Sequence, residues 1–111
     1  MAFLNEKTLD AVQIRDTSAH NGVTVDNQGL MVKTVIIENG LNQPVSLQCQ
    51  GSASADFSNF FNLGSSFDAD ASANSYQTCT SYIPYFRVVA TCAVAPSSGA
   101  LTVYIFKFGG A

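Results

Sequence analysis

The sequence contains few groups that perform chemistry. Its 111 residues include one histidine, three cysteines and no tryptophan, and only 12% of them are charged, about half of the usual share for a soluble domain. The five basic residues are scattered along a chain whose net charge is −3. Because no basic footprint for nucleic acid or anionic lipid is present, we expect neither a nucleic-acid partner nor a membrane partner.

Long apolar runs are missing as well. None approaches the length of a membrane span, and the first seven residues lack the basic and apolar regions of a signal peptide, so we expect no export by the usual route. A surface poor in charge must consist largely of small polar residues. Such a surface suits an assembled or extracellular particle better than a dispersed cytosolic monomer.

Catalytic and metal-binding patterns are correspondingly thin. His20 lies four residues after Asp16 in a turn-rich segment, and a flexible turn is a poor place to preorganise a base, so we interpret it as a solvated loop histidine. Asp68 and Asp70 begin a run with oxygen-bearing side chains at alternate positions, as calcium loops do. However, Ala73 stands where such a loop needs glycine. We expect no catalytic residue, no metal and no cofactor.

The three cysteines are odd in number and contain no Cys-x-x-Cys pair, so neither a zinc site nor a disulfide framework is indicated. Cys49 and Cys92 fall on predicted inward strand faces, which is typical of buried small hydrophobes. Cys79 lies near a predicted strand end, where an intermolecular disulfide is an alternative to an inert thiol.

What the sequence does have is a series of short runs typical of β-strands, without a convincing amphipathic helix. β-branched residues dominate residues 30–38, which predicts a central strand, and residues 45–50 alternate between apolar and polar side chains. Residues 75–80 predict another strand. Seven or eight strands separated by turn signals predict an all-β fold, an antiparallel β-sandwich or jelly roll.

Two segments are harder to place. Residues 57–63 predict a strand or an irregular aromatic plug, with Phe57 and Phe61 on one face and Phe60 on the other. Residues 1–29 carry a disproportionate share of the charge and only short apolar runs. We interpret residues 1–29 as an N-terminal arm or edge hairpin rather than core, and residues 30–111 as the sandwich domain. The arm would cap a sheet edge or reach a neighbouring subunit.

The C-terminal runs, residues 85–94 and 100–108, read as one hairpin around a turn at residues 95–99. Alternation directs one apolar set inward: Phe86, Val88, Ala90, Cys92, Leu101, Val103 and Ile105. The outward set is also largely apolar and has no obvious internal cover, so it predicts a subunit interface. Its six candidate residues are Tyr85, Arg87, Val89, Tyr104, Phe106 and Phe108. Arg87 should bond an acid or a carbonyl there.

Three segments together resemble small β-sandwich modules of tailed-phage virion proteins and of related spore-surface or appendage proteins. The segments are residues 35–52 (VIIENGLNQPVSLQCQGS), 85–91 (YFRVVAT) and 95–105 (APSSGALTVYI). The resemblance implies an assembly role in a capsid decoration protein, a fibre or a filament, and it carries no catalytic residue. Residues 51–57 (GSASADF) depart from the Ser-Leu-Asp-Gly and Trp segment of many such modules.

The sequence and the resemblance together predict a non-enzymatic structural protein, a phage capsid decoration (cement) protein. Its partners would be copies of itself, as a trimer or higher oligomer, and the major capsid protein. Its place would be the virion surface, or else an extracellular or spore-surface appendage. One alternative is a self-polymerising extracellular filament that exchanges its N-terminal strand. The other is a carbohydrate-binding module that stacks sugars on tyrosines such as Tyr76, Tyr82, Tyr85 and Tyr104.

Overall fold

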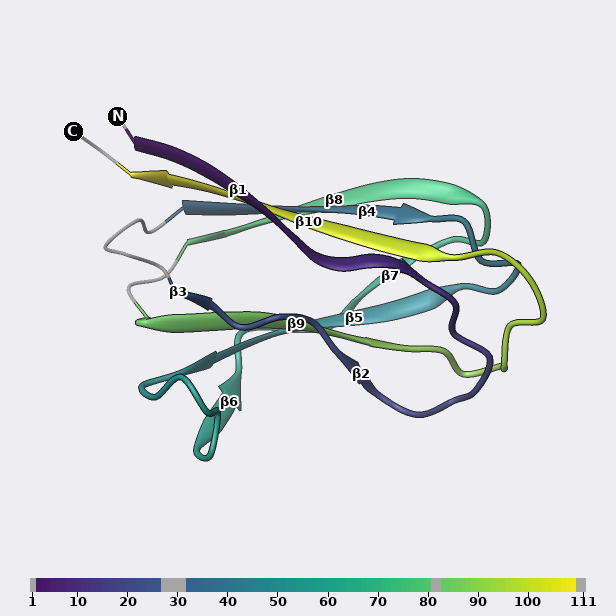
Figure 1. Cartoon of the computed structure of the whole chain (residues 1–111), viewed down its shortest axis with the longest axis horizontal. Coiled ribbons are helices and arrows are strands. Elements are labelled where there is room, and N and C mark those ends of the chain that lie inside the picture. The colour runs from purple at the N-terminus through teal and green to yellow at the C-terminus, as the bar shows by residue number, and fades with distance from the viewer. Residues whose placement is uncertain (1, 27–31, 81–82, 110–111) are drawn as a thin grey trace.

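The computed structural model describes the backbone of residues 2–26, 32–80 and 83–109, and within these ranges the chain contains only strands and loops (Figure 1). Six strands are long: β1 (Ala2–Val12), β4 (Val32–Asn39), β5 (Val45–Ser52), β8 (Ala73–Thr80), β9 (Tyr85–Thr91) and β10 (Leu101–Gly109). Four are short: β2 (His20–Asn21), β3 (Val25–Asp26), β6 (Phe60–Asn62) and β7 (Phe67–Ala69). The described part of the chain includes no helix that could cross a membrane.

The strands form two antiparallel layers that face each other (Figure 1). Sheet A has the order β1-β10-β4-β8. Sheet B is centred on the pair β9 and β5, with β2 and β3 along the free edge of β9 and β6 and β7 along that of β5. β2 and β3 together form one interrupted edge strand, and so do β6 and β7. Counted in this way, the two sheets have eight strands, as expected. The prediction of an all-β antiparallel sandwich is therefore confirmed.

The core lies between the two sheets and follows the alternation read from the sequence. Val45, Leu47 and Cys49 of β5 point inward and are almost completely buried. The predicted inward sets of β9 and β10 are buried as well, each side chain at 0% exposure: Phe86, Val88, Ala90, Cys92, Leu101, Val103 and Ile105. The central strand predicted at residues 30–38 is confirmed for residues 32–38, because β4 lies between β10 and β8; residues 30 and 31 lie outside the described residues.

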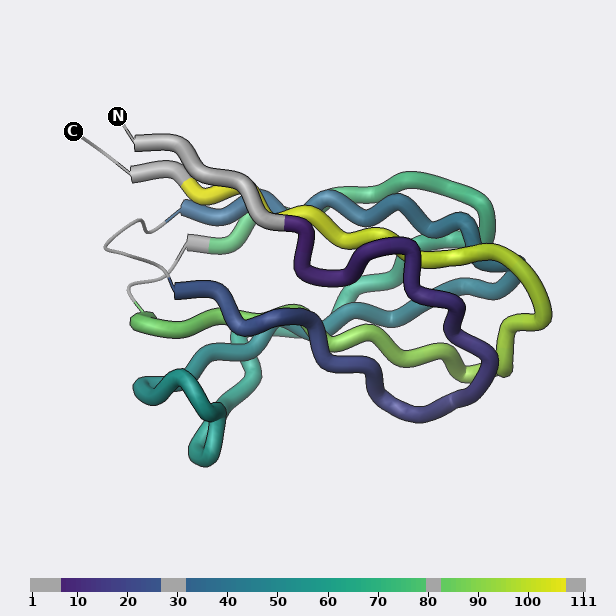
Figure 2. The backbone as a smooth tube through the Cα atoms, viewed as in Figure 1, coloured from purple at the N-terminus to yellow at the C-terminus, as the bar shows by residue number. Residues whose placement is uncertain are grey.

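The predicted C-terminal hairpin is wrong. β9 belongs to sheet B and β10 to sheet A, and the connection between them crosses from one layer to the other at one end of the sandwich (Figure 2). Cys92 and Pro96 anchor this connection in the interior, while residues 93–95 and 97–99 are exposed. Alternation shows correctly which side chains point inward. It does not show whether two strands are neighbours in one sheet or belong to two sheets that face each other, because the same side chains are buried in both cases.

The N-terminal segment runs along the edges of both sheets. β1 pairs with β10 in sheet A, while β2 and β3 pair with β9 in sheet B. Leu9, Ile14 and Val25 of this segment belong to the hydrophobic core, which corrects the expectation that residues 1–29 lie outside it.

One end of the sandwich is held together by the buried side chain of Asn39. Asn39, at the end of β4, is 2% exposed, and its amide nitrogen donates to the carbonyl oxygens of Gln43, Ala69 and Asp70 at 3.0–3.2 Å. Its side-chain oxygen accepts a hydrogen bond from the backbone nitrogen of Leu41 at 3.1 Å. A single side chain therefore ties the β4–β5 connection to the β7–β8 connection.

Candidate functional site

The structure separates the six predicted interface residues onto opposite faces of the sandwich. Tyr85, Arg87 and Val89 lie on the outer face of sheet B, and Tyr104 and Phe106 lie on the outer face of sheet A. Phe108 belongs to β10, where its backbone pairs with those of Phe3 and Val32, but its side chain lies outside the described set. The six residues therefore cannot form one continuous patch, because the hairpin on which that patch depended does not exist.

The outer face of sheet A carries a row of side chains that crosses all four strands. The strand register places Lys7 of β1, Tyr104 of β10, Ile36 of β4 and Tyr76 of β8 side by side. Lys7 Nζ lies 5.5 Å from the centre of the Tyr104 ring, and Tyr76, at 72% exposed, protrudes at the far edge. Directly opposed side chains in neighbouring strands contact one another. We call these four residues, together with Phe106, the aromatic face.

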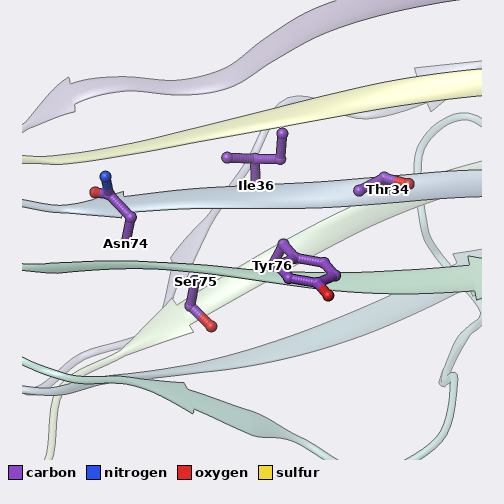
Figure 3. Close-up of a pocket in the computed structure, with 5 residues that line it drawn as sticks. All are labelled: Thr34, Ile36, Asn74, Ser75 and Tyr76. Carbon is purple, nitrogen blue, oxygen red and sulfur yellow. The ribbon is translucent and has the colours of Figure 1, made fainter.

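A shallow hollow of about 400 Å³ lies at the β4–β8 side of this face. It is lined by Thr34, Ile36, Asn74, Ser75 and Tyr76, and Figure 3 shows the tyrosine ring lying along β8 beside the β4 side chains. The hollow therefore combines an exposed aromatic ring with small hydroxyl and amide groups. Sequence reasoning named Tyr76 but missed Ile36 and Thr34, although their even positions on β4 already placed them opposite the buried residues.

The outer face of sheet B is partly covered by residues of the same chain. The Arg87 guanidinium lies 4.3 Å from the centre of the Phe57 ring and 5.0 Å from that of Phe60. Its Nε donates a 2.8 Å hydrogen bond to Oε1 of Gln50, which is the carbonyl partner expected for this arginine. Burial lowers the pKa of Arg87. The phenylalanine-rich segment thus packs against Arg87 on sheet B, on the opposite side of the sandwich from the aromatic face of sheet A.

The predicted placement of the three phenylalanines is corrected here. Phe57 and Phe60, expected on opposite faces, both contact Arg87. Phe57 is buried, whereas Phe60 and Phe61 are 50% and 48% exposed. The backbone of Phe57 adopts a positive φ of 54°, which turns the chain between the two rings. A strand-like alternation across residues 57–61 therefore does not apply.

The interior at the other end of the sandwich contains charged and sulfur-bearing groups. Lys33 of β4 is fully buried, with its Nζ 5.3 Å from the centre of the Phe86 ring, and burial lowers its pKa. The sulfurs of Cys49 and Cys79 lie 3.4 Å apart. The hydrogen bond from Cys49, with a smaller contribution from Lys33, lowers the pKa of Cys79 to about 7. The pKa of Cys49 is raised, first by this contact and then by burial.

The remaining polar candidates lie on the surface. Nε2 of His20 is 2.8 Å from Oδ1 of Asp16, and this bond is the main cause that lowers the pKa of Asp16. His20 is half-buried in β2 rather than free in a loop. Asp68 and Asp70 are exposed, and within the described ranges no three His, Cys, Asp or Glu side chains gather as a metal site would require.

No known protein family and no curated protein matches the chain by sequence. Several solved structures have a similar fold. The structure of XepA, an exported protein of PBSX, superposes with a TM-score of 0.74 at 13% identity; the match covers 97% of this chain but only 38% of the XepA chain.

Two further structures match over nearly their whole length. The SPBc2 prophage-derived protein YomS has a TM-score of 0.61 at 12% identity, covering 96% of this chain and 92% of its own. PirA has a TM-score of 0.59 at 14% identity, covering 95% of this chain and 92% of its own. At such identities these similarities concern the fold alone. The chain is a two-sheet β-sandwich similar in fold to the PBSX exported protein XepA, to the SPBc2 prophage-derived protein YomS and to PirA.

Proposed function

We propose that the protein is a non-enzymatic structural subunit that associates with copies of itself through the aromatic face of sheet A, as a decoration protein on the surface of a phage capsid. The observation that carries the proposal is the row from Lys7 to Tyr76. It places Tyr104, Ile36 and the 72% exposed Tyr76 on one open sheet face. Contiguous apolar surface of this kind marks interaction sites.

The chemistry of the face favours a second copy of the same chain as the partner. The row is neutral across β10, β4 and β8, and its charge is confined to Lys7 at the β1 edge, where an ion pair joins it to Asp10 at 3.5 Å. Aromatic side chains in the centre with charge at the rim are the usual anatomy of a protein interface. The outer face also carries the exposed Glu38 of β4, two positions from Ile36 and outside the row. A row whose centre is neutral can meet its own copy without like charges facing each other in the centre.

The phage setting is supported by the resemblance of residues 35–52, 85–91 and 95–105 to virion modules. It is also supported by the fold shared with XepA and YomS, whose names assign them to PBSX and to the SPBc2 prophage. From these we infer a location on the virion surface and a major capsid protein as the second partner. Contact of the aromatic face with the same face of a second copy joins two chains, so a trimer or higher oligomer would need a second contact on each copy.

The test compares two aromatic truncations on opposite sides of the sandwich. Tyr76→Ala removes an exposed ring of the aromatic face, and Phe61→Ala removes an exposed ring near sheet B. Neither should unfold the protein, because both rings are largely in water already. Sedimentation velocity over a range of concentrations should show oligomers for the wild type and Phe61→Ala, and monomers for Tyr76→Ala. A wild-type chain that is monomeric at every concentration, alone and mixed with capsids, would refute the proposal.

A carbohydrate-binding role is the second candidate, favoured by the hollow beside Tyr76. The exposed ring offers a stacking surface, and Thr34, Asn74 and Ser75 offer hydroxyl and amide groups that could bond sugar hydroxyls. A glycan array probed with the wild type and with Tyr76→Ala separates the two roles. Saturable binding that the variant loses, by a chain that stays monomeric, would favour the carbohydrate role over assembly.

A further inference from the structure

Cys49 and Cys79 come from opposite sheets and meet in the interior. Cys49 is on β5, in the middle of sheet B, and Cys79 is on β8, at the edge of sheet A. Cys79 is opposite Lys33 of β4 in the strand register, and like Lys33 it points toward sheet B. The two sulfurs lie 3.4 Å apart. A disulfide bond is about 2.05 Å long, so the sulfurs need to approach by little more than an ångström.

We propose that Cys49 and Cys79 are a site of reversible oxidation, at which thiol–disulfide exchange with a low-molecular-weight disulfide forms an intrachain disulfide that links the two sheets. This proposal is independent of the assembly role. It replaces the intermolecular disulfide considered for Cys79, because Cys49 of the same chain lies within 3.4 Å of it.

The two cysteines differ in the way that such an exchange requires. Cys79 is half-buried at a sheet edge, whereas Cys49 is 2% exposed, so an external disulfide reaches Cys79 first. The S–H of Cys49 and the nearby Lys33 ammonium favour the thiolate of Cys79, and the thiolate is the attacking species. Cys49 then acts as the resolving thiol.

The steps balance without any further reactant. The Cys79 thiolate attacks one sulfur of the small disulfide, forming a mixed disulfide and releasing one small thiolate. Cys49 then gives up its proton and attacks the Cys79 sulfur, which breaks the mixed bond and releases the second small thiolate. Each protein sulfur has lost one electron, the small disulfide has gained two, and the protons from the protein thiols go to the two released thiols.

The consequence for the fold concerns the edge strand β8. Its ladder partner is β4 of the same sheet, and the bond would anchor it covalently to the centre of sheet B. The closed loop would span residues 49–79. A loop of this size constrains the unfolded chain enough to raise the Tm by roughly 10 °C.

The third cysteine provides a matched control. Cys92 is fully buried, and burial raises its pKa, so it should remain a thiol. The full-length protein is incubated with oxidised glutathione, alkylated under denaturing conditions and analysed by mass spectrometry. We expect one alkylated cysteine, Cys92, and a peptide in which Cys49 is joined to Cys79. The Cys92→Ser variant should form the same link and show the same rise in Tm.

Three outcomes would overturn the proposal. The wild type could retain three alkylatable thiols, it could stop at a mixed disulfide on Cys79, or it could form dimers linked through Cys79. The Cys79→Ser variant, changed at a half-buried edge position, should fold, keep both remaining thiols alkylatable and show no oxidant-dependent change in Tm. A rise in Tm that persists in this variant would equally contradict the inferred link.

Discussion

Lys33 and Lys107 lie directly opposite each other on β4 and β10, and both point into the interior of the sandwich. Their exposures are 0% and 1%. Lys107 donates a 2.7 Å hydrogen bond to the backbone oxygen of Asp26, while Lys33 lies over the Phe86 ring. Two buried lysines at neighbouring positions are rare in a small domain, and burial lowers the pKa of Lys33.

Replacing Lys33 with methionine should stabilise the protein at neutral pH by about 1 kcal/mol, because the thioether fills a similar volume without the cost of a buried charge. Burial lowers the pKa of Lys33 from 10.5, so the ammonium form weakens the folded state. Wild-type stability should therefore rise as the pH increases from the folded pKa toward 10.5, and the advantage of Lys33→Met should vanish above that value. Urea unfolding of the wild type and of Lys33→Met at several pH values measures both stabilities.

Lys107→Met is the matched control for this charge effect. It removes the hydrogen bond to Asp26, so we expect a loss of about 1 kcal/mol at neutral pH. If both methionine variants shift the free energy of unfolding in the same direction, the distinction between the two lysines is wrong.

Asn39→Ala should destabilise the protein by about 3 kcal/mol, since the substitution removes the donor to three carbonyl oxygens and the acceptor for Leu41 in a buried site. Asn42 is an exposed asparagine in the same connection, bonded to Ser97 at 2.8 Å. Asn42→Ala should cost about 1 kcal/mol or less. Denaturant unfolding measures the loss of stability in each of the two variants. Equal losses would refute the structural role assigned to Asn39.

Two glycines with positive φ distinguish backbone strain from steric overlap. Gly64 has a φ of +71° with open space around it, so Gly64→Ala should cost about 1 kcal/mol from the left-handed backbone alone. Gly99 has a φ of +88°, and a Cβ there would overlap the carbonyl oxygen of Gly40. Gly99→Ala should therefore cost at least about 3 kcal/mol. Thermal unfolding of Gly64→Ala and Gly99→Ala measures the difference between their losses of stability.

Arg87→Lys should lower the stability by about 1 kcal/mol although the charge is kept. Lysine lacks the planar group that stacks on Phe57 and Phe60 and the Nε that bonds Gln50. Hydrogen exchange should then speed up around β6. Arg15, an exposed arginine, provides the comparison, and Arg15→Lys should leave stability within about 0.5 kcal/mol of the wild type.

Much of the fold could be predicted because local alternation in a strand directly reports which face is buried. Val45, Leu47 and Cys49 follow this rule, as do the inward residues of β9 and β10. Alternation does not report which strand lies next to another. Nothing within residues 85–108 distinguishes a hairpin from two strands in facing sheets, because both arrangements bury the same side chains.

For the site too, the sequence predicts which side chains face outward, but it does not predict which strands lie next to one another. Tyr104 and Phe106 could be placed on an outer face, but their neighbours on that face depend on the order of strands in sheet A. That order brings Tyr76, 28 positions before Tyr104 in the chain, into the same row. The proximity of Cys49 and Cys79 likewise depends on how two sheets are stacked, which no local pattern encodes.

The pairing of β1 with β10 joins the first and last strands of the fold and places Ala2 opposite Gly109 (Figure 1). The same end of the sandwich therefore serves both as entry and as exit for the chain. A circular permutant could join these two strands through a short linker and open at the exposed residues 64–66, with every ladder of the two sheets retained. A protein or surface tethered at either end would lie at the opposite end of the molecule from the contact between Gly40 and Gly99.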